Sequence, residues 1–321
     1  MYKSKIKVHK SKNTPKVAIV FPGQGSQRVG MGLDLYKTSP AARAVFEAAD
    51  DTLGFSLSSL CFEGPDEELR RTINTQPAIL VVSIAALKYA QERGLLEGQF
   101  KPAFVAGHSL GEYSSLVAAG VLSLPDAVRL VRERGRLMEE AGQKCPGGMV
   151  ALLGLNEDTA EEICQVTGTE IANINCSGQI VISGSKNAIS NAINVARARG
   201  ARRAISLEVS GAFHSSLMQW ARRGLKKVID VLHFHNPRIP IIANTTAKPL
   251  IRANAVRAEL QNQLCRCVHW QKSVEFMRDE GVSTFVELGP GDVLTGLIQR
   301  ICPDAKAFKL NDLIALEGAR S

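Results

Sequence analysis

The pentapeptide Gly107-His108-Ser109-Leu110-Gly111 constrains the fold more than any other feature of the sequence. It follows a strand-like apolar run, residues 102–107, and precedes a helix-compatible segment, residues 112–119. In the pattern Gly-x-Ser-x-Gly, the serine occupies a strained strand-to-helix turn, and side chains at the glycine positions would collide with adjacent backbone. Such a turn lifts the serine hydroxyl above the end of a sheet. The sequence therefore predicts an α/β protein with Ser109 as candidate nucleophile, the alternative being an ordinary tight turn.

The remaining chain supports an α/β fold with an insertion. Strand-like and helical apolar spacing alternate up to about residue 143, with a helix that starts near Pro77. Residues 149–209 then follow the order β-α-β-β-α-β, with a hairpin turn at Ser177-Gly178, and a helix is expected at 214–231. We therefore expect an α/β-hydrolase-like catalytic domain from residues 16–143 and 211–312, interrupted by a ferredoxin-like α+β subdomain at 144–210. Residues 1–15 and 313–321 are expected to be tails, the first basic and disordered.

Composition and charge exclude several classes of protein. The chain has 321 residues, 45% hydrophobic and 22% charged, which is ordinary for a globular protein. Its longest apolar stretch, residues 78–87, is too short to span a bilayer. The net charge is +8, but six lysines in the first sixteen residues account for most of it. Without these six lysines, the chain has only two more basic than acidic residues. We therefore expect no nucleic-acid binding and no membrane association.

Cysteine usage indicates a reducing compartment. Seven cysteines are scattered along the chain without the regular spacing of a disulfide framework, so reduced thiols in the cytoplasm are expected. Cys265, Cys267 and His269 form an alternating pattern that is compatible in principle with zinc. No Cys-x-x-Cys pair accompanies them, so no metal is expected and buried thiols are the better interpretation.

A serine nucleophile needs a base, and the chain has six histidines. His9 lies in the tail, and His108 is a poor base because neighbours on an extended segment point to opposite faces. His214 follows a strand end and a flexible glycine, which favours it over the alternatives His233, His235 and His269.

The Gly-rich run of residues 22–27 follows the first strand. It lacks the lysine and the spacing of phosphate-binding loops, and it suits the second oxyanion donor of a hydrolase-like site. An ordinary Gly-rich turn is the alternative.

Six runs in the right order resemble the malonyl-CoA:acyl carrier protein transacylases, a family of acyltransferases of fatty-acid and polyketide synthesis. The resemblance extends from about residue 16 to residue 311. The runs are Phe21-Pro22-Gly23-Gln24-Gly25-Ser26-Gln27, Thr75-Gln76-Pro77-Ala78, Gly107-His108-Ser109-Leu110-Gly111-Glu112-Tyr113, Arg134-Gly135-Arg136-Leu137-Met138, Gly211-Ala212-Phe213-His214-Ser215 and Glu287-Leu288-Gly289-Pro290-Gly291.

The resemblance implies a role for each of nine residues. Ser109 would take malonyl as an ester and His214 would be the general base. The backbone amides of Gln24 and Leu110 would form the oxyanion hole, and the main-chain carbonyl of Gln263 would orient His214 in place of an aspartate. Arg134 would bind the malonyl carboxylate through its planar guanidinium. The remaining substrate-binding residues would be Asn175, His108 and Phe213, the last disfavouring methylmalonyl.

The function implied is ping-pong transfer of malonyl from coenzyme A to the phosphopantetheine thiol of acyl carrier protein, without a cofactor and by a monomer. A stand-alone acyltransferase of polyketide synthesis and a serine esterase are the alternatives. Basic residues of the insert (Lys186, Arg197, Arg199 and Arg202) are candidates for guiding an acidic carrier. One departure is Cys267, where relatives usually carry proline, which puts the backbone near Gln263 in question.

Overall fold

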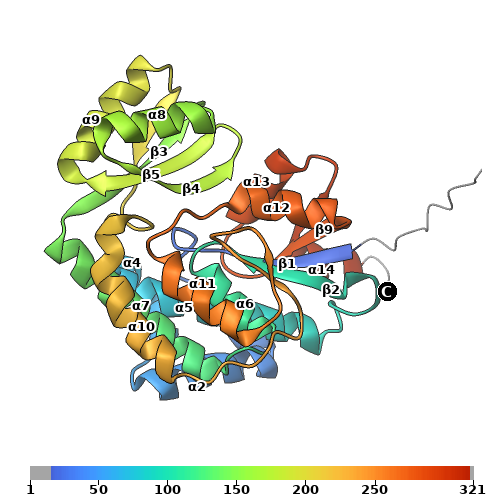
Figure 1. Cartoon of the computed structure of the whole chain (residues 1–321). Coiled ribbons are helices and arrows are strands. Elements are labelled where there is room, and N and C mark those ends of the chain that lie inside the picture. Colours follow the sequence, from blue (N-terminus) through green and yellow to red (C-terminus); the bar gives the residue numbers. More distant parts are fainter. Residues whose placement is uncertain (1–15, 319–321) are drawn as a thin grey trace, which may run out of the picture.

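Two β-sheets organise the computed structural model, which describes residues 16–318 and leaves the expected basic tail outside them. The larger sheet has the strand order β10-β9-β1-β2-β7-β8, and its pairs are parallel except β7 with β8 (Figure 1). Its strands are β1 (Lys16–Phe21), β2 (Pro102–Gly107), β7 (Ile241–Ile242), β8 (Pro249–Leu250), β9 (Val282–Glu287) and β10 (Lys306–Lys309).

Helices cover both faces of this sheet, which explains why its strands are apolar on both sides. Along β1, Val17, Ile19 and Phe21 enter the larger core, whereas Ala18 and Val20 enter a smaller core on the opposite face. The larger core packs against α2 (Pro40–Leu53), α5 (Thr72–Glu92), α6 (Gly111–Ala118), α7 (Leu124–Lys144), α10 (Gln219–Val231) and α11 (Ala253–Gln263). The smaller core packs against α12 (Trp270–Asp279) and α13 (Val293–Ile301).

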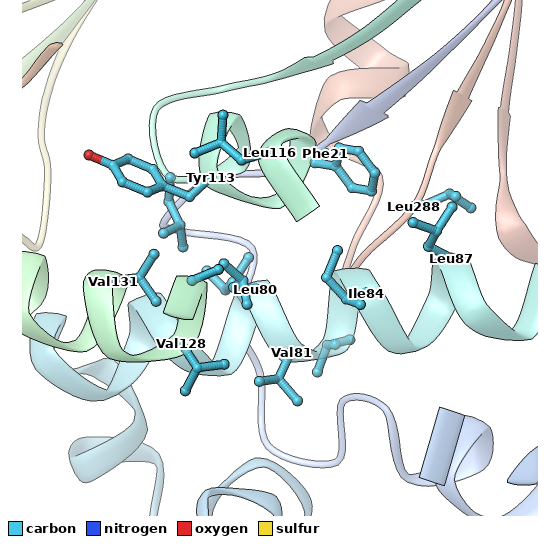
Figure 2. Packing of buried hydrophobic residues seen from close by; sticks show 14 of the residues in the cluster. Phe21, Leu80, Val81, Ile84, Leu87, Tyr113, Leu116, Val128, Val131 and Leu288 are labelled. Atoms are coloured by element: carbon cyan, nitrogen blue, oxygen red, sulfur yellow. The ribbon is translucent and has the colours of Figure 1, made fainter. Parts of the chain in front are cut away.

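Helix α5 lies at the centre of the larger core. Figure 2 shows its side chains facing the elbow helix α6, the end of β1 and helix α7. The residues in contact there include Leu80, Val81, Ile84 and Leu87 of α5, with Phe21, Tyr113, Leu116, Val128, Val131 and Leu288 around them. The shorter helices of the large domain are α1 (Leu33–Thr38), α3 (Leu57–Glu63), α4 (Asp66–Arg70), η1 (Gly98–Phe100), η2 (Ser216–Met218) and α14 (Leu310–Gly318).

The second sheet confirms the expected ferredoxin-like subdomain. It has the order β4-β5-β3-β6 with every pair antiparallel, and one face packs on two helices. It forms the separate green and yellow lobe of Figure 1. Its elements are β3 (Gly147–Leu153), α8 (Glu157–Thr167), β4 (Glu170–Cys176), β5 (Gln179–Ser185), α9 (Lys186–Ala198) and β6 (Arg203–Ser206).

Two backbone contacts hold the subdomain against the large domain. Its edge strand β4 pairs with the segment after α11, where Ile174 N donates to Val268 O (3.0 Å) and Val268 N donates to Ala172 O (2.9 Å). The returning chain then crosses α7 so closely that a Cβ on Gly142 would lie 1.9 Å from Ser210 O. The path that leads to His214 is therefore closely constrained.

Several expected boundaries differ from the structure. Helix α5 begins at Thr72, a turn before the expected start near Pro77, so this proline lies inside it. Proline lacks the N–H that would bond Ile73 O, and Arg132 Nη1 donates to that carbonyl instead (3.0 Å). In place of the expected helix at 214–231, the structure has the 3₁₀ turn η2 from Ser216 and then α10 from Gln219. The left-handed backbone of His214 (φ 58°) keeps that residue out of the helix.

The expectation of a C-terminal tail from residue 313 is wrong for residues 313–318. Helix α14 occupies them, and Leu313 is buried in the larger core. Leu310, Leu313 and Ile314 have helical spacing, so they present one apolar stripe to that core. Within residues 16–318, no helix is long and apolar enough to cross a bilayer.

Candidate active site

The Gly-x-Ser-x-Gly turn joins β2 to α6 with the strain expected for a nucleophile elbow. Ser109 has φ 50°, a left-handed conformation that costs a non-glycine residue on the order of 1–3 kcal/mol. A Cβ on Gly107 would lie 1.9 Å from the carbonyl carbon of Gly111, and one on Gly111 would lie 2.0 Å from Phe21 O. These are the backbone collisions that require glycine on both sides of the serine.

A cavity of about 570 Å³ opens in front of Ser109, between the large domain and the subdomain. Apolar side chains of both lobes, among them Met149, Val181 and Leu297, line it together with polar groups. Seven of the residues predicted from the sequence line its walls: Gln24, His108, Ser109, Arg134, Asn175, Phe213 and His214. The other two, Leu110 and Gln263, are fully buried behind it.

Ser109, His214 and Gln263 form the hydrogen-bond chain that the resemblance implies. His214 Nε2 lies 2.8 Å from Ser109 Oγ, and His214 Nδ1 lies 3.0 Å from the main-chain oxygen of Gln263. A carbonyl oxygen only accepts, so Nδ1 carries the hydrogen of a neutral imidazole and Nε2 presents its lone pair to the serine. This geometry suits His214 to act as a base, a role that stays a prediction, and Cys267 leaves the Gln263 carbonyl in place.

The surroundings of His214 keep it neutral. Burial, followed by the positive charge of Arg134, lowers the pKa of His214 to about 3. A group with so low a pKa is unprotonated, and available as a base, throughout the neutral and mildly acidic range.

The low pKa of His214 predicts that acylation of Ser109 is insensitive to pH around 6.5. An ordinary histidine, with a pKa near 6.5, is mostly protonated at about pH 5.5 and inactive as a base. Here we expect kcat/KM for acylation to stay constant between about pH 8 and about pH 5.5. Rapid-mixing measurements of the rate of Ser109 acylation at constant ionic strength test this, and a fall with an apparent pKa near 6.5 would contradict it.

Arg134 brings a buried positive charge beside the nucleophile. It is 1% exposed, and its Nη2 donates to Ser109 Oγ (3.2 Å) and to Gln263 Oε1 (2.9 Å). Its Nη1 donates to Gln76 Oε1 (2.8 Å), and the guanidinium stacks over the Tyr113 ring at 5.1 Å. These partners, all in the described part of the chain, are neutral, so the charge lies ready for an anionic ligand.

One of the expected oxyanion donors, Leu110, belongs to the elbow, and the other, Gln24, belongs to the loop that packs on it. Leu110 immediately precedes α6. The first backbone N–H groups of a helix point out of its N-terminal end, which for α6 is the end beside Ser109. The loop of Gln24 packs directly on the elbow, since a Cβ on Gly23 would lie 2.5 Å from His108 O. The oxyanion role of both amides stays a prediction.

His108, Asn175 and Phe213 complete the wall. His108 Nε2 lies 2.8 Å from Asn175 Oδ1, so the elbow is linked to strand β4 of the subdomain. The amide oxygen only accepts, so His108 Nε2 carries the hydrogen and donates to it. Burial lowers the pKa of His108. Phe213 lies beside His214 in the cavity wall.

Elsewhere, residues 16–318 contain no cluster of three metal-ligand side chains, and Cys267 Sγ lies 4.0 Å from His269 Nδ1.

The sequence did not single out three residues that support this site. Gln76 holds Arg134, while Glu112 accepts from Gln263 Nε2 (2.5 Å), and both lie in the conspicuous runs quoted above. Burial, followed by the charge of Glu259, raises the pKa of Glu112 well above its ordinary value. Asn244 bonds the elbow backbone, and its only sequence signal is a polar residue shortly after a strand.

A half-buried serine hydrogen-bonded to a buried histidine, on such a turn of an α/β sheet, defines an enzyme that transfers acyl groups through serine. Comparison with known proteins makes this class more specific. A family model described as acyl transferase domain matches residues 18–315, so the chain belongs to the acyl transferase family. The malonyl CoA-acyl carrier protein transacylase of Bacillus subtilis (strain 168) is 44% identical over 307 residues, covering 94% of this chain and 95% of that protein.

Solved structures agree with this assignment. The acyl-carrier-protein S-malonyltransferase of Bartonella henselae superposes with a TM-score of 0.91 at 43% identity, covering 95% of this chain and 99% of that one. A malonyl-transacylase in complex with a type II polyketide-synthase acyl-carrier protein superposes with a TM-score of 0.90 at 41% identity. The match covers 94% of this chain and 99% of that one.

Proposed function

We propose that this enzyme transfers malonyl from malonyl-CoA to the phosphopantetheine thiol of acyl carrier protein, supplying fatty-acid synthesis. The observation that carries the proposal is Arg134, a buried guanidinium 3.2 Å from Ser109 Oγ with neutral partners. No carboxylate among the described residues bonds this guanidinium directly, although Glu112 lies near enough to act on its charge. Such a site favours an acyl group that brings its own carboxylate to the nucleophile. The names of the relatives, malonyl CoA-acyl carrier protein transacylases, support the same substrate pair.

In the first half-reaction, Ser109 Oγ attacks the thioester carbonyl while His214 Nε2 takes the hydroxyl proton. The amides of Gln24 and Leu110 would stabilise the oxyanion, a contribution of about 3–4 kcal/mol per donor. Collapse of the tetrahedral intermediate breaks the C–S bond, and the leaving thiolate of coenzyme A takes the proton from His214. The product is a malonyl ester on Ser109 with its carboxylate on Arg134.

In the second half-reaction, the phosphopantetheine thiol replaces coenzyme A in the cavity. His214 takes the thiol proton, the sulfur attacks the ester carbonyl, and the proton returns to Ser109 Oγ as the ester C–O bond breaks. A bound carboxylate also offsets the Arg134 charge that lowers the pKa of His214. The base is therefore strengthened when the correct acyl group is present.

Basic residues of the subdomain and the free cysteines bear on the carrier and on the location. Lys186, Arg197, Arg199 and Arg202 lie on or just after α9 of the subdomain, where we propose that they guide an acidic carrier protein, although Arg199 already pairs with Glu162. All seven cysteines are free, which supports a cytoplasmic location.

Loading of a carrier in polyketide synthesis is the second candidate. It uses the same chemistry, and the complex of a malonyl-transacylase with a type II polyketide-synthase carrier gives it a specific precedent. Hydrolysis is less well supported, because an esterase has no need of the buried charge of Arg134.

A panel of carrier proteins, each offered with malonyl-CoA or methylmalonyl-CoA, tests the proposal. We expect malonyl to move to the fatty-acid carrier fastest. We also expect methylmalonyl to react about 10–200 times more slowly, since Phe213 crowds the extra methyl and one methyl group is worth about 1–3 kcal/mol. Mass spectrometry of the carriers gives both rates. Release of free malonate as the main product would refute transfer, and a preference for a polyketide carrier would select the second candidate.

A further inference from the structure

The strained elbow leaves two backbone groups beyond the reach of the sheet. Strand β7 pairs with β2 only through Val105 and Ala106, so the Gly107 carbonyl and the Ser109 N–H lie past the last ladder contacts. Asn244 reaches both of them with one side chain. Its Oδ1 accepts from Ser109 N (2.7 Å), and its Nδ2 donates to Gly107 O (2.7 Å).

The carboxamide of Asn244 takes the place of a peptide group. In a parallel pair, a residue bonds the carbonyl and the N–H that flank the residue opposite, here those on either side of His108. Asn244 supplies the same donor and acceptor from its side chain, two residues after β7 ends. It therefore prolongs the hydrogen bonding of the sheet into the turn, where the left-handed backbone of Ser109 ends the regular strand.

Asn244 is itself held firmly. It is 2% exposed, and its own N–H donates to Glu112 Oε1 (3.0 Å) while its carbonyl accepts from His269 N (2.9 Å). The next residue, Thr245, donates its N–H and hydroxyl to the Glu259 carboxyl (2.8 and 2.5 Å). Two buried glutamates on different helices thus fix the turn that carries the carboxamide.

We propose that Asn244 is a positioning residue for the nucleophile. By holding Gly107 O and Ser109 N–H, its carboxamide maintains the left-handed backbone that aims Ser109 Oγ at His214 and the following amide at the oxyanion. The inference deepens the proposed function but depends on it only for the identity of the acyl group. A neutral fluorophosphonate, which phosphonylates any activated serine, therefore tests the positioning separately from malonyl transfer.

The first experiment compares Asn244→Leu with wild type. We expect phosphonylation of Ser109 and single-turnover loading from malonyl-CoA to slow by a similar factor, about 10²-fold, as a small misplacement of reacting groups does. Asn74→Leu is the matched control, because Asn74 is also buried and bonded, but to Glu68 and Arg132. We expect it to lower the melting temperature without slowing phosphonylation. An Asn244→Leu protein that reacts at the wild-type rate would overturn the proposal.

Asn244→Asp tests the same idea without removing the side chain. The ionised carboxylate accepts from Ser109 N–H but repels Gly107 O, whereas the protonated carboxyl has a donor and an acceptor in the positions of the carboxamide. The phosphonylation rate relative to wild type should therefore rise as pH falls from about 8 to about 5, where a buried carboxyl takes up its proton. A merely structural role predicts a ratio that does not change with pH, and that result would also overturn the proposal.

Discussion

Replacing Ser109 with alanine is expected to abolish the addition of a malonyl mass to the protein and the loading of carrier protein. The hydroxyl is the group that the elbow presents to His214 Nε2 at 2.8 Å and to Arg134 Nη2 at 3.2 Å. Loss of the nucleophile from a serine–histidine pair lowers turnover by roughly 10⁶-fold in a comparable protease, so no transfer should be measurable. Intact-protein mass spectrometry after incubation with malonyl-CoA, followed by peptide mapping, gives the result directly.

Ser114→Ala is the matched control for this change. Ser114 lies on α6, five residues from the nucleophile, and its buried hydroxyl has no hydrogen-bond partner among the described residues. Its removal therefore leaves no broken bond, and full labelling is expected. Labelling of the Ser109→Ala protein at the wild-type extent would show that another residue carries the acyl group.

Replacing Arg134 with alanine is expected to convert a malonyl-selective enzyme into one that no longer prefers a carboxylate. Removing one partner of a buried, hydrogen-bonded charge pair costs about 2–5 kcal/mol, or roughly 30- to 4,000-fold in kcat/KM for malonyl-CoA. Acetyl-CoA brings no carboxylate, so its loading should stay constant or rise. Competition between the two thioesters, read as the ratio of acyl masses on Ser109, measures the change in selectivity.

Arg136→Ala controls for the loss of an arginine from the same helix. Arg136 lies two residues further along α7 and forms half-exposed ion pairs with Glu133 and Glu140. Surface pairs of this kind contribute about 0–1 kcal/mol, so neither thioester should be affected. Equal losses of malonyl and acetyl loading in the Arg134→Ala protein would remove Arg134 from carboxylate recognition and point to general damage of the site.

The local sequence pattern was sufficient to predict the elbow and most of the helices and strands. The position of Ser109 between a strand and a helix follows from a five-residue motif and its flanks, since the strain and the glycine requirement arise within the motif and its contacts. The order of strands and helices in the subdomain was equally readable. The predicted helix boundaries were wrong where a residue distant in sequence stabilises the backbone. At Pro77, for example, Arg132 donates to the Ile73 carbonyl that the proline leaves without a partner inside α5.

The choice among similar residues depended on tertiary structure. From the residues alone, His214 was only favoured among four histidines, and Arg134 was one of four arginines on a helix. The fold brings Gln263 O to within 3.0 Å of His214 and leaves Arg134 1% exposed, whereas Arg129 and Arg136 pair with acids at the surface. Family resemblance pointed to the same two residues, but the physical reason is visible only in the packed structure.

The sequence by itself determined the serine elbow, the fold class and the inserted subdomain, because strain, periodicity and turn chemistry act mostly between near neighbours. Only the tertiary structure decided which base and which cation reach Ser109, and it alone revealed Asn244. That residue lies 135 positions from the nucleophile, and its role exists only because β7 ends beside β2 in the sheet. Hydrogen bonds between such distant segments depend on strand order and register, which no local pattern encodes.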